Sequence, residues 1–109
     1  MKWLGWGLLS GLSWFWSCGA PPTAPALHIG VAASVAPAMD SLKIVYQQQH
    51  PALPIHTTVR ASGQLAAQLV EGLALDIFVA ADTSYPAYLY QQGRGAAAPV
   101  VYAYGQLAL

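Results

Sequence analysis

The chain has 109 residues, of which 56% are hydrophobic and 7% are charged, and its four basic and four acidic side chains give a formal net charge of zero. This length suggests one domain at most, and so apolar a composition excludes a disordered chain. The basic residues are scattered singly, so no basic stripe is present to release counterions from a nucleic-acid backbone. The composition therefore argues against nucleic-acid binding and indicates a folded domain with a largely uncharged surface.

The amino-terminal segment has the pattern of a signal peptide. Lys2 supplies a positive charge, and the uncharged apolar run from Trp3 to Trp16 is shorter than the roughly 20 residues that a membrane-spanning helix needs. We therefore expect residues 1–18 to direct export to the periplasm or the extracytoplasmic face of the membrane. The following GAPPTAPA, residues 19–26, predicts an extended Pro-rich tether.

Cys18 is the single cysteine, so no disulfide can form within the chain. Its place after the apolar run resembles a lipoprotein-processing site, where the cysteine becomes the lipidated first residue. A lipid anchor on Cys18 is therefore one expectation. Ordinary cleavage a few residues later and an uncleaved anchor are the alternatives.

The next segment reads as a strand followed by a helix. LHIGVAA (27–33) is compatible with a β-strand, and VAPAMDSLKIVYQQQH (35–50) predicts a helix with Leu42 and Val45 on one face. Pro37 suits the first turn of this helix, because its missing N–H costs nothing there. Pro51 ends it, because the residue before a proline disfavours helical geometry.

The same alternation continues along the chain. Strands are predicted for IHTTV (55–59) and DIFVAA (76–81), and helices for SGQLAAQLVEG (62–72) and SYPAYLYQQG (84–93). Gly72 and Gly93 are the expected carboxyl-terminal stops of these two helices, because glycine accepts the left-handed geometry that ends a helix.

PVVYAYGQLAL (99–109) predicts a last strand. The resulting β-α-β-α-β-α-β order with short connections predicts an α/β fold, in which helices cover a mostly parallel sheet to give three layers. Because the chain stops inside an apolar run, we also expect a truncated sheet with an unpaired edge.

Two serines stand at strand-to-helix junctions, Ser34 before the first predicted helix and Ser62 at the start of the second. In a parallel α/β sheet, ligands lie outside the carboxyl ends of the strands, where both serines fall. The first N–H groups of a helix have no internal partner and carry the positive end of the helix dipole. With an added hydroxyl donor, each junction could bind part of a compact oxyanion without lysine or arginine.

A plainer interpretation of these serines is also open. Serine at such a junction is most often an N-cap, which stabilises a helix by about 1 kcal/mol. Gly63, which follows Ser62, favours the anion site slightly because it would let a ligand approach the backbone closely.

Three segments together resemble, in order and spacing, the first lobe of the periplasmic molybdate-binding proteins of ABC transporters. They are VAASVAPAMDSL, ASGQLAAQLVEG and LDIFVAADTSYPAYLYQQG. That family shows an A-A-S strand end, an A-S-(S/G)-x-L-A junction and a D-(I/V/L)-F-x-(S/A)-A-D strand, and Asp76, Phe78, Ala81 and Asp82 match the last of these. VYAYGQLAL is similar to the strand that leads out of this lobe, so the resemblance covers residues 27–109.

The resemblance implies the first lobe of a type II periplasmic-binding-protein fold, a two-lobed architecture that closes on molybdate or tungstate. The family's first-lobe contacts come from serines and map onto Ser34 and Ser62, while the contacts of the second lobe have no counterpart here. Val35 and Ala36 depart from the family, which often has a leucine followed by a polar residue. The resemblance implies no catalysis, no cofactor, molybdenum only as the oxyanion, and a membrane permease as partner.

Two alternatives of different kinds stay open from the sequence. One is a binding protein for another tetrahedral oxyanion, sulfate or phosphate, since pocket size separates these ligands and the sequence does not show it. The other is a non-functional remnant of a truncated reading frame.

Nucleotide-binding and nucleophilic sites have weak support. Gly93, Gly95 and Ala98 fit a relaxed G-x-G-x-x-A pattern but follow a predicted helix, where a dinucleotide site needs a strand. Ser62 lacks the G-x-S-x-G elbow of a serine nucleophile, and Cys18 lies in the signal segment. We therefore expect a protein that is not an enzyme.

Titratable side chains do not form a metal or acid–base site in the sequence. The histidines lack the spacing of metal ligands; they are His28, His50 and His56. Asp76 and Asp82 stand at opposite ends of a predicted strand, too far apart for joint acid–base chemistry, and we expect them to cap helices and to bond loops. Arg60 precedes the second serine junction and is expected to be a solvated strand-end residue.

Overall fold

The structure, a computed structural model, describes Gly19 and residues 25–109. The predicted signal segment, Cys18 and most of the tether lie outside these residues. Strands and helices alternate along the described chain: β1 (Leu27–Ala32), α1 (Ala36–Gln49), β2 (Ile55–Arg60), α2 (Ser62–Glu71), β3 (Ile77–Val79) and α3 (Ser84–Gln91). None of these helices has both the length and the apolar character that crossing a bilayer would require.

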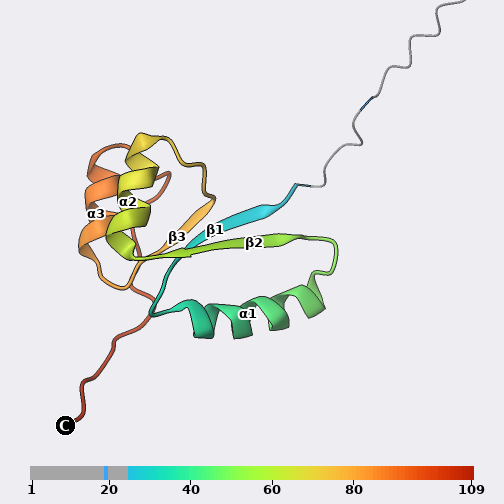
Figure 1. The fold of residues 1–109 in the computed structure, drawn as a ribbon, viewed down its shortest axis with the longest axis horizontal. Coiled ribbons are helices and arrows are strands. Elements are labelled where there is room, and N and C mark those ends of the chain that lie inside the picture. Colours follow the sequence, from blue (N-terminus) through green and yellow to red (C-terminus); the bar gives the residue numbers. More distant parts are fainter. Residues whose placement is uncertain (1–18, 20–24) are drawn as a thin grey trace, which may run out of the picture.

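The strands form a parallel sheet in the order β2-β1-β3 (Figure 1). Along β1 and β2 the register pairs Leu27 with Ile55 and Ala32 with Arg60. On its other side β1 pairs with β3, and Val31 is opposite Val79. Helix α1 covers one face of the sheet, while α2 and α3 lie together on the other. The predicted three-layer α/β arrangement with a parallel sheet is thus confirmed.

The ends of the helices follow the predicted proline and glycine signals. Helix α1 has Pro37 in its first turn and ends at a carboxyl cap on His50, directly before Pro51. Gly72 caps α2 with a φ of 111°, and its N–H donates to carbonyls of the last helical turn. Gly93 follows α3 with a φ of 70°. Both glycines adopt the left-handed geometry that other residues rarely take.

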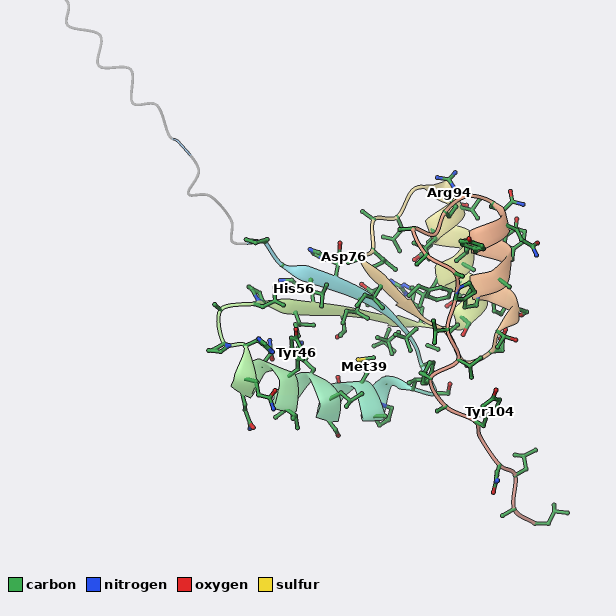
Figure 2. All side chains as sticks on the ribbon, turned by 180° about the vertical axis from the view of Figure 1, so that it is seen from behind. Met39, Tyr46, His56, Asp76, Arg94 and Tyr104 are labelled. Atoms are coloured by element: carbon green, nitrogen blue, oxygen red, sulfur yellow. The ribbon has the colours of Figure 1, made fainter. Side chains whose placement is uncertain are left out.

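Alternating residues of β1 divide the core between the two faces of the sheet. Ile29 and Val31 face α1 and form a buried cluster with Ile55, against which Met39 packs. Figure 2 shows Met39 pointing from α1 toward the sheet. On the opposite face, Gly30 leaves room for side chains of the α2 region, because a Cβ added there would collide with Leu75. The absence of a side chain at Gly30 therefore lets this layer approach β1 closely.

Helix α1 packs less tightly than its apolar pattern suggested. It contains no buried residue, and Leu42 and Val45 are 61% and 54% exposed. Both line a hollow of about 460 Å³ between α1 and the sheet, together with Ile77 of β3. The three-stranded sheet is too narrow to bury the whole apolar face of α1.

The predicted strand over 99–109 is wrong. None of these residues is in a strand, and no backbone hydrogen bond joins them to β3 among the described residues. Tyr104 and Leu107 are fully or almost fully exposed. Aromatic and β-branched side chains favour strands only where a neighbouring strand completes the ladder, and here the backbone passes β3 without pairing.

Candidate functional site

All three helices begin at one edge of the sheet, the edge where the strands end (Figure 1). This follows from the parallel topology, because each strand runs in the same direction and leads directly into a helix. Helix N-termini with their unpaired N–H groups are therefore gathered at this carboxyl edge. The edge also carries the two serines that the sequence singles out.

The register brings Ser34 and Ser62 to matching positions. Ala32 of β1 pairs with Arg60 of β2, and each serine follows its strand end by two residues. The pairing continues one step further, since the Ala33 N–H donates to the Arg60 carbonyl over 3.0 Å. The two serine junctions are therefore neighbours at the carboxyl edge. The Arg60 side chain is exposed, as expected for a strand-end residue.

Ser62 is buried, with 9% of its surface exposed, and its hydroxyl oxygen accepts a hydrogen bond from the Ala81 N–H over 3.1 Å. This bond ties the start of α2 to the end of β3. Ser62 is not the N-cap of α2; that position is Ala61, whose extended backbone makes no side-chain cap. Because the hydroxyl acts as acceptor toward Ala81, its proton is free to be donated elsewhere.

Ser34 differs from Ser62 in its burial and in its hydrogen bonding. It is exposed, and its hydroxyl has no hydrogen-bond partner among the described residues. The N-cap of α1 is Val35, again without a side-chain cap. The plainer interpretation of the two serines as N-caps is therefore wrong, because the backbone places each of them one position away from the capping residue.

The N–H groups of α1 and α2 are unequally available. In α2, Leu65 is the first residue whose N–H is bonded, to the Ala61 carbonyl, so the amides of Ser62, Gly63 and Gln64 have no acceptor within the described chain. At α1 a turn already uses two amides, because Val35 and Ala36 donate to the carbonyls of Ala32 and Ala33; Pro37 has none to offer. The N-terminus of α2 is thus the better donor site.

The start of α3 is closed by a carboxylate from its own chain. Asp82 accepts hydrogen bonds from the hydroxyl and amide of Ser84 and from the amide of Tyr85. The Ser84 hydroxyl holds the pKa of the Asp82 carboxyl below its usual value; desolvation opposes this shift, and the two amides add to it. Thr83 stands at the N-cap position of α3, but the Asp82 carboxylate bonds the first amides of this helix as a capping side chain does, in agreement with the capping role predicted for Asp82. These bonds leave α3 unavailable to an external anion.

Gly63 has a different role from the one predicted. A Cβ at this position would lie 2.9 Å from the Tyr85 hydroxyl and 3.2 Å from the ring carbon that bears it. The space beside Gly63 is therefore occupied by a side chain of α3 rather than open to a ligand. Gly63 allows α2 and α3 to approach each other at this point.

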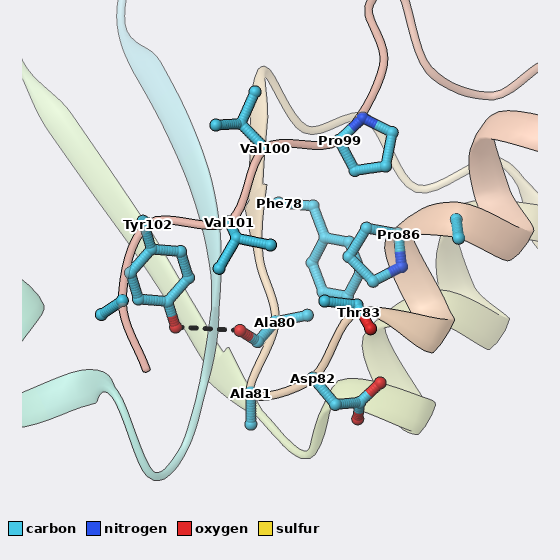
Figure 3. Close-up of a pocket in the computed structure, with 12 residues that line it drawn as sticks. Phe78, Ala80, Ala81, Asp82, Thr83, Pro86, Pro99, Val100, Val101 and Tyr102 are labelled. Carbon is cyan, nitrogen blue, oxygen red and sulfur yellow. Dashed lines mark hydrogen bonds between the residues drawn. The ribbon is translucent and has the colours of Figure 1, made fainter. Parts of the chain in front are cut away.

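A hollow of about 310 Å³ lies at the end of β3 (Figure 3). Its walls come from Phe78, from the turn that leads to α3, and from Pro99 to Ala103. The Tyr102 hydroxyl crosses toward β3 and donates to the Ala80 carbonyl over 2.9 Å. Ser34 and Ser62 are not among its lining residues. No feature of the sequence indicated this role for Tyr102, because its segment was expected to be a strand.

His28, His56 and Asp76 lie at the opposite edge of the sheet, where the strands begin. His28 and His56 are register partners whose rings stack with centroids 5.3 Å apart. The Asp76 carboxylate accepts a hydrogen bond from the His28 N–H over 2.8 Å, which extends the contact of β1 with the segment before β3. Figure 2 shows His56 and Asp76 near this edge. Within the described residues, no group of three or more His, Cys, Asp or Glu is arranged to hold a metal ion.

Comparison with known proteins places these features in a family. Residues 27–109 match the family model of bacterial extracellular solute-binding proteins. Among solved structures, a similar one is described as the substrate binding domain of a molybdenum ABC transporter from Clostridium difficile, with 27% sequence identity and a TM-score of 0.59. The similarity covers 62% of this chain and 29% of that one, so this chain spans less than a third of its structural relative. No curated protein matches.

The family match includes every strand and helix of the described structure, and the structural likeness agrees with the parallel three-layer fold. The chain therefore belongs to the bacterial extracellular solute-binding protein family.

Proposed function

We propose that this protein is the extracytoplasmic substrate-binding component of an ABC importer and that it binds molybdate or tungstate without chemical change. Residues 27–109 supply the first-lobe half of the ligand site. A membrane permease is the partner that accepts the ligand. Family membership and the name of the structural relative support this assignment.

The observation that carries the proposal is the pair of serine junctions at the carboxyl edge. Ser34 and Ser62 follow paired strand ends at matching positions, and three amides at the start of α2 have no acceptor within the described chain. An oxyanion placed here meets hydroxyl and N–H donors at the positive ends of two helix dipoles. The Asp82 carboxylate is already bonded to α3, which satisfies that helix internally.

This arrangement suits a transport protein because it relies on neutral donors. Hydrogen bonds to a charged ligand are stronger than those between neutral groups, which supports binding. No lysine or arginine is needed to neutralise the anion, so release does not require breaking a buried ion pair.

The test is a titration of the ¹⁵N-labelled full chain with molybdate, tungstate and sulfate, followed by NMR, which detects weak binding as well as tight binding. Molybdate and tungstate should shift the amide signals of Ser34, Ser62 and Gly63 more than those of β1. Larger shifts with sulfate than with molybdate would mean that the ligand of this site is a smaller oxyanion. Absence of any shift with all three anions would overturn the proposal.

A further inference from the structure

The peptide group between Ala80 and Ala81 is hydrogen-bonded on both sides. Its carbonyl accepts from the Tyr102 hydroxyl over 2.9 Å, and its N–H donates to the Ser62 hydroxyl oxygen over 3.1 Å. The described chain contains no cis peptide bond, and in a trans peptide the C=O and N–H point in opposite directions. Tyr102 and Ser62 therefore hold this peptide, which directly follows β3, from opposite sides.

We propose that Tyr102 is a positioning residue for ligand binding, which acts on Ser62 through the Ala80–Ala81 peptide; this inference rests on the proposed function. The hydrogen bonds run in one direction, from the Tyr102 O–H to the Ala80 carbonyl and from the Ala81 N–H to the Ser62 oxygen. Each bond in such a chain polarises the next. The Ser62 O–H then becomes a better donor to an anion, and its oxygen is fixed in place.

The burial of these groups favours a positioning role over a packing role. Ala80 and Ser62 are 6% and 9% exposed, whereas the Tyr102 side chain is 60% exposed. A side chain so exposed contributes little to the core, and its hydroxyl bonds to the carbonyl of a buried residue. Tyr102 also belongs to the segment that follows the described secondary structure, so it connects the position of that segment to the ligand site.

The chain offers a matched control two residues away. Tyr104 is 89% exposed, and its hydroxyl has no hydrogen-bond partner among the described residues. Tyr104→Phe removes the same hydroxyl from the same segment without touching the Ala80–Ala81 peptide. Tyr102→Phe keeps the ring, so its effect reports the hydroxyl bond alone.

The experiment measures molybdate affinity of the full chain by NMR titration for the wild type, Y102F, Y104F, S62A and the double variant S62A/Y102F. Because Tyr102 only strengthens the bond that Ser62 donates, its removal predicts about twofold to fourfold weaker binding in Y102F and no change in Y104F. The double variant should bind no more weakly than S62A alone, because Tyr102 acts through Ser62. Without ligand, the Ala81 amide proton signal should move upfield in Y102F and stay unchanged in Y104F.

The outcomes separate this inference from the proposed function. If S62A loses binding while Y102F keeps wild-type affinity and an unchanged Ala81 signal, the positioning role is overturned and the proposed function stands. If the wild type binds none of the anions, both are overturned. Should Y102F fail to fold, the wild type still decides: molybdate must shift the Tyr102 ring signals, this shift must vanish in S62A, and its absence in the wild type rejects the inference.

Discussion

The two serine junctions look alike in the sequence and differ in the structure. Ser62 is buried and bonded to Ala81, which follows β3, and it begins a helix whose first three amides have no acceptor within the described chain. Ser34 is exposed and has no bonded hydroxyl among the described residues, and the amides of Val35 and Ala36 that follow it are used by a turn. One junction is fixed before any ligand arrives, and the other is free to adjust.

This difference predicts that the two serines contribute differently to ligand binding. A pre-positioned donor loses little entropy when a ligand binds, whereas an exposed side chain must be ordered first. Ser62 is therefore expected to give most of the affinity in this lobe, and Ser34 to complete the contact. The Ser62 hydroxyl also accepts a hydrogen bond from Ala81 in the folded protein, whereas the Ser34 hydroxyl has no hydrogen bond among the described residues.

Ser62→Ala should have the largest effect. It removes an oriented donor to a charged ligand, so molybdate affinity should fall on the order of tenfold or more. It also leaves the Ala81 N–H without its partner, which should lower the free energy of unfolding by about 1 kcal/mol. NMR titration and thermal unfolding measure the two effects. Ser41→Ala is the control, since that hydroxyl bonds to Pro37 within α1; unchanged affinity in S62A would contradict the comparison.

Ser34→Ala should weaken molybdate binding less, by about threefold to tenfold, because the exposed hydroxyl contributes one adjustable hydrogen bond. Its thermal unfolding midpoint should match that of the wild type, since the folded state has no bond to lose. The same titration and melting experiments test both points. A fall in stability equal to that of S62A would show that the two junctions are structurally equivalent after all.

Gly63→Ala tests which group occupies the space beside α2. Alanine is favoured over glycine in a helix by about 1 kcal/mol, but its Cβ meets Tyr85, so the net change in unfolding free energy should be smaller than this gain. In a Tyr85→Ala background the full gain should appear in denaturant unfolding. An equal effect in both backgrounds would mean that Tyr85 does not fill this space.

A substitution of Asp82, which closes the start of α3, should have the smallest effect on stability. The start of α2, in contrast, is not closed by a side chain of the described residues. The pKa of the Asp82 carboxyl is held below its ordinary value of 3.8. Its stabilising contribution is therefore present above that value and is lost as the pH falls through the lower folded-state pKa. Asp82→Asn keeps a capping oxygen but does not titrate. Wild-type and D82N melting midpoints should diverge slightly on acidification from about pH 6 to about pH 2, and parallel curves would argue against this cap.

Much of the fold could be predicted because its signals are local. Proline and glycine set the ends of the helices within one or two residues of their predicted positions, as Pro51, Gly72 and Gly93 show. The alternation of apolar runs with helical patterns was sufficient to predict the parallel α/β sheet. The last apolar run, 99–109, was misassigned because strand formation depends on a partner backbone that local sequence does not specify.

The candidate site was predictable only in outline. The sequence located Ser34 and Ser62 at strand ends, and the parallel register makes those ends neighbours. It did not indicate that Tyr85 fills the space at Gly63 or that Ala81 bonds to Ser62, because these contacts join residues about 20 positions apart. The roles of the two serines in ligand binding stay predictions.

The sequence by itself determined the order of strands and helices from Leu27 to Gln91, the positions where the helices stop, and the family motifs at the strand ends. Those properties depend on backbone preferences and on hydrophobic periodicity, which act over a few residues. Only the tertiary structure decided which serine is buried, which helix start is closed by Asp82, and where the Tyr102 hydroxyl is bonded. These depend on contacts between distant segments, and such contacts exist only once the layers have packed on the sheet.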